Sequence, residues 1–156
     1  GPLRMLRRQD HKAIDFALEA TGMMSLAGRL LSQLSGGERQ RAWIALTLAQ
    51  STPILLLDEP TTFLDIGHQL EILELVAGFN RSCGMTLVLV LHDLNHAARY
   101  TNRMVVLNGG AVVADGKPGD VLTPTMLADV FRVQADIVTD ARASHPICIP
   151  YASLSG

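Results

Sequence analysis

Apolar residues recur along the chain with two different periods. At 10–20, 38–50 and 66–81 they return every three or four positions, which predicts three amphipathic helices. Apolar runs at 54–57 and, after Thr86, at 87–91 predict two strands, 54–57 and 86–91, that are covered on both faces, as is typical of parallel sheets. The pattern therefore predicts an α/β fold in which strand, helix and strand form one right-handed crossover unit.

Polar residues and glycines mark where the elements begin and end. Asp10 is expected to cap the first helix, and Asp93 is expected to cap a short helix that runs through Tyr100. The dipeptide Asn108-Gly109 separates two further apolar stretches and predicts a β-hairpin with a type I′ turn. The remaining expected elements are the hairpin strands 104–107 and 111–114, a small helical region at 127–131 and edge strands near 136–139 and 147–149.

Composition excludes several classes of protein. Hydrophobic residues make up 48% of the 156 positions and charged residues 18%, so the chain can form a core and is not of the disordered class. A formal net charge of −2 gives the chain no overall basic field that would favour nucleic acid as a partner. The longest uninterrupted apolar run has five residues, whereas a membrane-spanning helix needs roughly 20. Cys83 and Cys148 are too few for a disulfide scaffold, so we expect a soluble protein of a reducing compartment.

Charged and polar residues follow both predicted strands. Asp58 and Glu59 come directly after the first strand, and His92 comes directly after the second. Parallel strands end at one edge of a sheet, where open α/β sheets bind their ligands. If the two strands are neighbours, about 4.8 Å apart, the acidic pair and the histidine should converge on one patch.

A glycine-rich segment precedes the second predicted helix. Gly36 and Gly37 would let a ligand approach the backbone closely, and Ser35 adds a hydroxyl donor. The helix that follows presents free N–H groups and the positive end of its dipole, which favours an anion. The segment therefore indicates a phosphate site, although such a sequence is equally compatible with a flexible helix cap. Trp43, inside the helix, is interpreted as a packing residue.

Four segments, taken in order, resemble the motifs of ABC transporter ATP-binding subunits. They are LSGGERQ at 34–40, similar to the family signature; ILLLDEP at 54–60, similar to Walker B with the catalytic glutamate; TFLD at 62–65, similar to the D-loop; and LHD at 91–93, similar to the switch-histidine segment. The resemblance implies the α/β fold of a P-loop NTPase of the ABC ATPase type. That fold has a mostly parallel sheet flanked by helices, with a small C-terminal β-hairpin and helical region.

Three further segments narrow the resemblance to one branch of the family. DIGHQ at 65–69, LHDLN at 91–95 and ARY at 98–100 are similar to the ATPases of ferric-siderophore, haem and vitamin B12 importers. The segment TTFLD at 61–65 favours iron-siderophore or related metal-chelate uptake. The resemblance implies a subunit that binds and hydrolyses ATP and works as a head-to-tail dimer with a second ATPase subunit. It also implies integral membrane permease subunits as partners, and a peripheral place on the cytoplasmic side of a bacterial inner membrane.

The resemblance also assigns roles to individual residues. Asp58 would hold Mg²⁺, Glu59 would orient and polarise the attacking water, and His92 would contact the γ-phosphate. Phosphoryl transfer of this type depends mostly on positioning and charge stabilisation. The other implied residues act on ATP held by the second subunit: Ser35, Gly36 and Gly37 contact its γ-phosphate, and Gln40 and Asp65 support that contact.

The P-loop motif GxxxxGK[ST], which the family needs to grip the β- and γ-phosphates, does not occur in these 156 residues. Lys12 and Lys117 are the two lysines, and only Lys117 follows a glycine. Pro118 stands where the motif requires Ser or Thr, so Lys117 does not belong to a P-loop. The chain by itself is therefore expected to be inactive as an ATPase.

The matched motifs indicate the C-terminal part of an ABC ATPase. We expect 1–33 to be the end of the helical subdomain, 34–134 to carry the signature, Walker B, D-loop and switch-histidine parts of the core, and 135–156 to form a tail with edge strands. Both predicted parallel strands would then lack part of their cover, so the isolated chain is expected to self-associate.

Two alternative functions stay open at this stage. One is a non-catalytic module that gives a signature motif in trans to a P-loop partner. The other is an ABC-type DNA-repair ATPase, which shares signature, Walker B and D-loop. Such ATPases place long coiled coils before the signature, whereas residues 1–33 show one short helix and no heptads.

Overall fold

The computed structural model describes residues 8–154. The chain divides into two compact units, Gly1–Val90 and Leu91–Gly156. Each unit has a hydrophobic core of its own: one is centred on Ile44, Leu55 and Ile72, and the other on Leu122 and Leu127. None of the described helices is both long and apolar enough to cross a bilayer.

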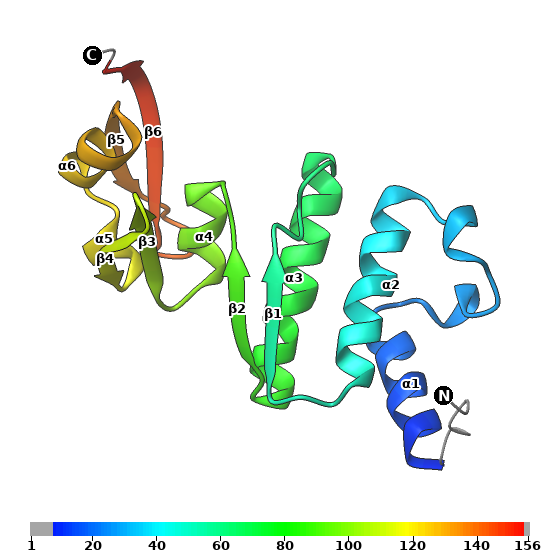
Figure 1. Cartoon of the computed structure of the whole chain (residues 1–156). Helices are drawn as coiled ribbons and strands as arrows, with labels where there is room; N and C mark the ends of the chain where they lie inside the picture. Colours follow the sequence, from blue (N-terminus) through cyan, green and yellow to red (C-terminus); the bar gives the residue numbers. More distant parts are fainter. Residues whose placement is uncertain (1–7, 155–156) are drawn as a thin grey trace. The chain divides into compact units, whose positions relative to one another are not determined.

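Unit 1 contains the three helices predicted from the apolar pattern and both predicted parallel strands (Figure 1). Its elements are α1 (Arg8–Ala20), the short 3₁₀ turns η1 (Met24–Leu26) and η2 (Leu31–Gln33), α2 (Gly36–Ala49), β1 (Ile54–Asp58), α3 (Ile66–Cys83) and β2 (Thr86–Val90). The expected strand–helix–strand unit is present: β1 and β2 pair in parallel, from Ile54 opposite Thr86 to Asp58 opposite Val90. This pair is the only parallel one among residues 8–154, so the parallel sheet of this chain has two strands.

The helix ends of unit 1 follow ordinary capping chemistry. Ser35 caps α2 and Asp65 caps α3, while Gly84 ends α3 in the left-handed conformation at φ 63°. Asp10 is a correction: α1 already begins at Arg8, and Asp10 lies in its first turn. An acidic side chain there interacts favourably with the helix dipole without serving as the cap.

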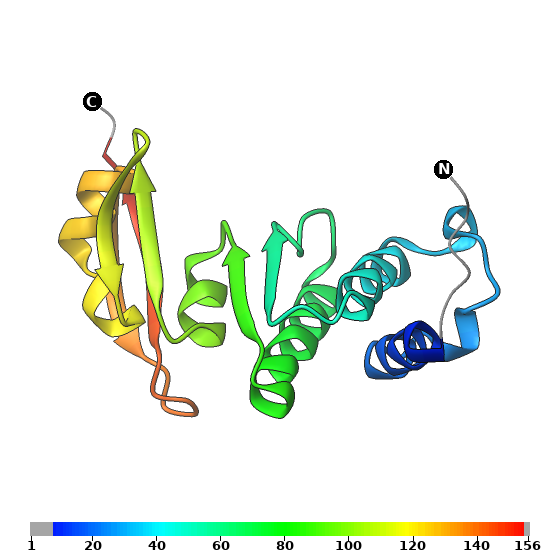
Figure 2. The same ribbon diagram turned by 60° about the horizontal axis from the view of Figure 1, so that its bottom comes forward.

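The β1–β2 pair is covered on one face, not on two. Leu55 and Leu57 are buried against α3, whose position on one side of the strands is visible in Figure 2. The alternate residues point the other way, and Leu56 is 66% exposed. The second apolar face is therefore exposed in this chain, as expected for strands that lack part of their cover. Trp43 is also a correction: at 53% exposure it lies on the outer side of α2 and does not pack in the core.

Unit 2 is built from short helices and two antiparallel strand pairs. Its elements are α4 (Leu94–Tyr100), β3 (Met104–Asn108), β4 (Ala111–Gly116), α5 (Pro118–Val121), α6 (Pro124–Met126), the π-helical η3 (Leu127–Phe131), β5 (Val133–Thr139) and β6 (Pro146–Ser153). Asp93 caps α4 as expected, and the predicted hairpin is β3–β4. The predicted edge strands pair with each other as β5–β6 and are longer than expected.

The hairpin turn lies one residue later than the sequence suggested. Asn108 pairs with Ala111, so the two central turn residues are Gly109 and Gly110. Both have positive φ, 56° and 79°, as a type I′ turn requires at its two central positions. Two consecutive glycines satisfy that requirement at less cost than Asn followed by Gly, which accounts for the shift.

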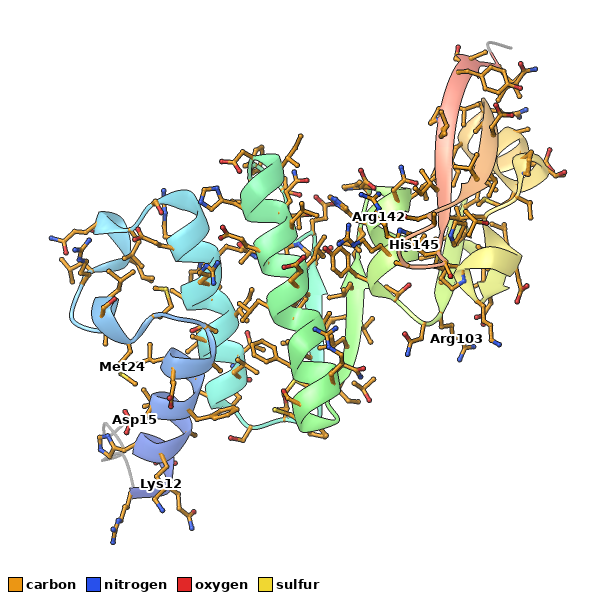
Figure 3. The ribbon with its side chains drawn as sticks, turned by 180° about the vertical axis from the view of Figure 1, so that it is seen from behind. Lys12, Asp15, Met24, Arg103, Arg142 and His145 are labelled. Atoms are coloured by element: carbon orange, nitrogen blue, oxygen red, sulfur yellow. The ribbon has the colours of Figure 1, made fainter. Side chains whose placement is uncertain are left out.

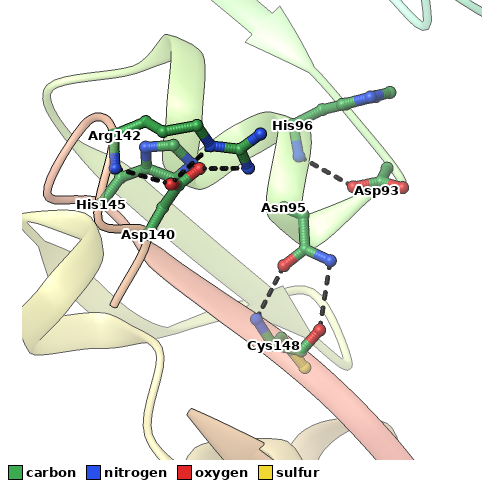
Figure 4. Close-up of polar contacts among 7 residues, drawn as sticks. All are labelled: Asp93, Asn95, His96, Asp140, Arg142, His145 and Cys148. Atoms are coloured by element: carbon green, nitrogen blue, oxygen red, sulfur yellow. Dashed lines mark hydrogen bonds and ion pairs between the residues drawn. The ribbon is translucent and has the colours of Figure 1, made fainter. Parts of the chain in front are cut away.

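Side-chain contacts hold the beginning of β6 and the loop before it (Figure 4). The amide of Asn95 on α4 pairs with both backbone groups of Cys148, accepting its N–H at 2.7 Å and donating to its carbonyl at 3.1 Å. In the β5–β6 loop, the Arg142 guanidinium donates twice to the buried Asp140 carboxylate and lowers the pKa of that group to about 2. These contacts join α4 and β6, and they order the loop before β6.

Candidate functional site

The acidic pair of the Walker B-like segment lies at the end of β1. Asp58 is the last residue of the strand and is exposed. Glu59 follows with φ 47°, and its backbone N–H donates to the carbonyl oxygen of Val90 at 3.1 Å. Left-handed backbone at a glutamate costs of the order of 1 kcal/mol and persists where the surroundings fix it. Glu59 is therefore held at the shared C-terminal edge of the two parallel strands.

Thr62 orients the carboxylate of Glu59. The Thr62 hydroxyl donates to Glu59 Oε2 at 3.0 Å, and the Thr62 backbone N–H donates to the Glu59 carbonyl at 3.2 Å. Between them, Pro60 is buried, so this turn is tightly packed. This role of Thr62 is not among the roles that the family resemblance implies. A hydroxyl residue three positions after an acid that closes a strand is a local signal for it.

The signature-like segment forms the N-terminus of α2. Ser35 Oγ accepts the N–H of Glu38 at 3.3 Å, and Glu38 Oε2 accepts the N–H of Ser35 at 2.7 Å, which together make a capping box. The hydrogen bond from the Ser35 backbone is the main reason that the pKa of Glu38 is lowered. Because the Ser35 oxygen serves as an acceptor, its hydroxyl hydrogen can donate to a ligand.

The two glycines of this segment have different surroundings. A methyl group added to Gly36 would meet no atom within 4 Å, so the backbone here is open to an approaching ligand. Gly37 is buried, and a methyl group added to it would lie 2.9 Å from Cδ2 of His68. Gln40 is half-buried one turn further along α2. Gly36 therefore offers the accessible backbone, while Gly37 is required by packing.

The D-loop-like segment ends in a pair of linked polar side chains. Asp65 Oδ1 accepts the backbone N–H of His68 at 3.0 Å, and Asp65 Oδ2 lies 2.8 Å from His68 Nδ1. These hydrogen bonds hold the pKa of Asp65 below its usual value and raise the pKa of His68 above 6.5. His68 was not among the residues predicted from sequence.

The Asp65–His68 pair should stabilise the fold more in mild acid than in base. A histidine with a raised pKa contributes stability that is fully present below its unfolded value, near 6.5, and is lost as the pH rises through its folded value. Asp65, whose pKa is lowered from 3.8, stays ionised throughout this range. We expect the urea midpoint of the unaltered chain to exceed that of the His68→Ala variant by a larger margin at about pH 5.5 than at about pH 9. His11→Ala, on the exposed side of α1, is the control. A difference that grows with pH would contradict the assignment.

His92 belongs to unit 2 and is exposed. It precedes Asp93, whose Oδ1 accepts the N–H of His96 at 2.8 Å at the start of α4 (Figure 4). Unit 1 brings together Asp58, Glu59 and the end of β2. Convergence of His92 with that edge stays a prediction.

Two other features of the described residues bear on ligand binding. No group of three or more His, Cys, Asp or Glu side chains is gathered there as a metal cage would require. A shallow hollow of about 560 Å³ in unit 2 is lined by residues between Asn108 and Val130, none of which belongs to the four motifs. The candidate site in unit 1 therefore consists of the C-terminal end of β1 and the N-termini of α2 and α3.

Comparison with known proteins agrees with the motifs. The family described as ABC transporter matches residues 3–62. The iron(3+)-hydroxamate import ATP-binding protein of Bacillus subtilis (strain 168) is 51% identical over 146 residues, which are 94% of this chain and 54% of that protein. The ferric enterobactin transport ATP-binding protein of Escherichia coli (strain K12) is 46% identical over 144 residues, 92% of this chain and 53% of that protein.

The fold is also found among solved structures. A transporter described as of the metal-chelate ABC type, in an inward-facing conformation, has a TM-score of 0.86 and 27% identity, over 97% of this chain and 61% of that one. This match confirms the α/β fold class, and the relatives confirm the resemblance to siderophore importer ATPases. The chain spans about half the length of the curated relatives it matches. It belongs to the family of ABC transporter ATP-binding proteins.

Proposed function

We propose that this chain forms the part of an ABC importer subunit that carries the catalytic glutamate and the signature motif, and that the complete subunit hydrolyses ATP to drive uptake of an iron chelate. The observation that carries the proposal is Glu59, fixed at the C-terminal edge of β1 and β2 with its carboxylate oriented by Thr62. The printed names of two relatives, for iron(3+)-hydroxamate import and ferric enterobactin transport, support the iron chelate as cargo.

Glu59 would act on the attacking water. Its carboxylate accepts a hydrogen bond from that water, which orients the lone pair and stabilises the proton that leaves during attack. Asp58, exposed beside it, offers the hard carboxylate oxygen that Mg²⁺ prefers. When bound, Mg²⁺ would neutralise charge on the β- and γ-phosphate oxygens. His92 would contact the γ-phosphate.

The N-terminus of α2 would bind the γ-phosphate of ATP held by a second subunit. The Ser35 hydroxyl and the backbone at Gly36 and Gly37 would donate to phosphate oxygens, assisted by the dipole of the 14-residue helix. Gln40 and Asp65 would support this contact. The open space at Gly36 fits this role, because it leaves the donors accessible.

Further parts of the proposal come from the resemblance. The partners would be a second ATPase subunit, arranged head to tail, and integral permease subunits, at the cytoplasmic side of the membrane. Residues 1–33 would belong to the helical subdomain, 34–134 to the catalytic core and 135–156 to a C-terminal tail.

A chimera tests the function directly. In it, this chain replaces the matching segment of the Bacillus subtilis relative, which supplies the residues that this chain does not contain. The chimera should restore growth of a strain lacking that relative when ferric hydroxamate is the sole iron source, and the same chimera with Glu59→Gln should not. A chimera that hydrolyses ATP but restores no uptake of any iron chelate would contradict the proposed cargo class.

The exposed face of the β1–β2 pair predicts that the 156-residue chain self-associates. Ile54, Leu56, Val88 and Val90 are each at least 45% exposed on this pair. Covering apolar surface gives about 2.5 kcal/mol for each 100 Å², which is enough to drive pairing. Light scattering at low micromolar concentration should show a dimer or larger species. Leu56→Ser should weaken it, whereas Phe16→Ser on α1 should not. A stable, cooperatively folding monomer that binds no hydrophobic dye would contradict this prediction.

A further inference from the structure

α2 and α3 come into close contact at the signature-like segment. The edge of the His68 ring lies against Gly37, so a methyl group added there would be 2.9 Å from Cδ2 and 3.5 Å from both Cγ and Nε2. Cβ atoms in proteins essentially never come within 3.0 Å of another heavy atom in this way. The ring therefore occupies the space that any side chain at position 37 would need.

The His68 ring is itself held in place. Its Nδ1 lies 2.8 Å from Asp65 Oδ2, and its backbone N–H donates to the other oxygen of the same carboxylate. Asp65 is the N-cap of α3, so the carboxylate is fixed by the helix end. Because the Asp65 carboxylate lies at Nδ1, the opposite edge of the ring, Cδ2–Nε2, faces Gly37.

A second contact further along keeps the two helices in register. Arg41 on α2 donates to Glu71 on α3 at 2.7 Å, one turn beyond Gly37 and His68 respectively. Arg41 also donates to the Thr21 carbonyl at 3.4 Å, which ties α2 to the end of α1. The ring of His68 thus packs between two helix ends whose spacing is already set.

We propose that His68 is a positioning residue that fixes the backbone of the signature segment at Gly37, with Asp65 as the group that orients its ring. The inference rests on the proposed function, because the segment that it positions is the one proposed to bind the γ-phosphate. It links the end of the D-loop-like segment to the signature-like segment within one subunit. A change in the position of Asp65 would then be passed through the ring to the phosphate-binding backbone.

The charges around the ring agree with this role. Asp65 and Glu71 favour the protonated ring and Arg41 disfavours it, and these are the charged groups that face it from α2 and α3. The protonated ring binds the Asp65 carboxylate more strongly, so the segment should be held most firmly below neutral pH.

A double-mutant cycle on the 156-residue chain tests the contact without any nucleotide. Gly37→Ala should lower the urea midpoint, because its methyl group collides with the ring. Gly37→Ala with His68→Ala should be more stable than the sum of the two single changes predicts, because the smaller side chain gives the methyl group room. Gly78→Ala, in the interior of α3 where a methyl group meets nothing within 4 Å, is the matched control and should not lower the midpoint. Additive effects of Gly37→Ala and His68→Ala would overturn the proposal.

ATP turnover of the chimera tests positioning. His68→Ala should lower kcat by up to about 100-fold while the KM for ATP stays unchanged, since small displacements of a positioned group cost rate more than binding. His68→Asn keeps a donor near Asp65 and should recover part of kcat. The pH profile of kcat should lose its His68-dependent limb in both variants. Wild-type kcat and pH profile in His68→Ala would overturn the proposal. If the unaltered chimera does not turn over ATP, the proposed function fails, while the cycle still decides whether His68 and Gly37 are coupled.

Discussion

Replacing Glu59 by glutamine in the chimera is expected to leave ATP binding intact and to reduce turnover by about 10²–10⁴-fold. Glutamine has the same shape, and its carbonyl oxygen can still accept the hydrogen bond from the Thr62 hydroxyl at 3.0 Å. The left-handed backbone at φ 47° is equally accessible to both residues. What the substitution removes is the negative charge that polarises the attacking water. Turnover is measured as phosphate release, and binding is measured with a fluorescent ATP analogue.

Two further variants separate this effect from a general loss of charge or structure. Glu19→Gln removes an exposed carboxylate from α1 and should leave turnover unchanged. Thr62→Val keeps the Glu59 carboxylate but removes the hydroxyl that orients it, so we expect a smaller loss than for Glu59→Gln. Turnover near wild type in Glu59→Gln would show that another group activates the water.

Local periodicity predicts much of unit 1, because burial in β1 and α3 depends on residues close in the chain. The strand bounds 54–57 and the helix start at Ile66 agree with the structure to within one residue. The turn at Gly109 and Gly110 was shifted by one position, since Asn-Gly and Gly-Gly both allow positive φ. The exposed second face of β1 and β2 was expected from the family resemblance and not from periodicity, because an all-apolar run does not say whether its second face is covered by the same chain.

The candidate site shows the same division. The order of the four motifs is read directly from the sequence. The edge position of Glu59 follows from the parallel direction of the two strands, which the sequence pattern predicts. The contact of Gly37 with His68 does not, because it depends on how closely α2 and α3 pack. Glycine at both 36 and 37 suggests one shared role in the sequence, whereas the structure assigns open backbone to Gly36 and tight packing to Gly37.

The 156-residue chain by itself is expected not to bind Mg-ATP at micromolar concentration and not to hydrolyse it. A nucleoside triphosphate such as ATP is bound through a lysine and several backbone N–H groups around its β- and γ-phosphates. Lys12 lies on the exposed side of α1 (Figure 3). Lys117 precedes α5, a four-residue helix that starts with Pro118, and proline has no N–H to donate to a phosphate.

Isothermal titration of the chain with Mg-ATP should therefore show no heat of binding where the chimera binds. A micromolar dissociation constant corresponds to about −8 kcal/mol, too much for the exposed Asp58 and the α2 N-terminus to supply without a P-loop. Adding a P-loop-containing partner subunit tests the role in trans. If the signature segment alone completes the partner's site, the unmodified chain should raise that partner's turnover and a Ser35→Ala variant should not. Micromolar binding of ATP to the chain alone would contradict the prediction and would require a phosphate site outside the four motifs.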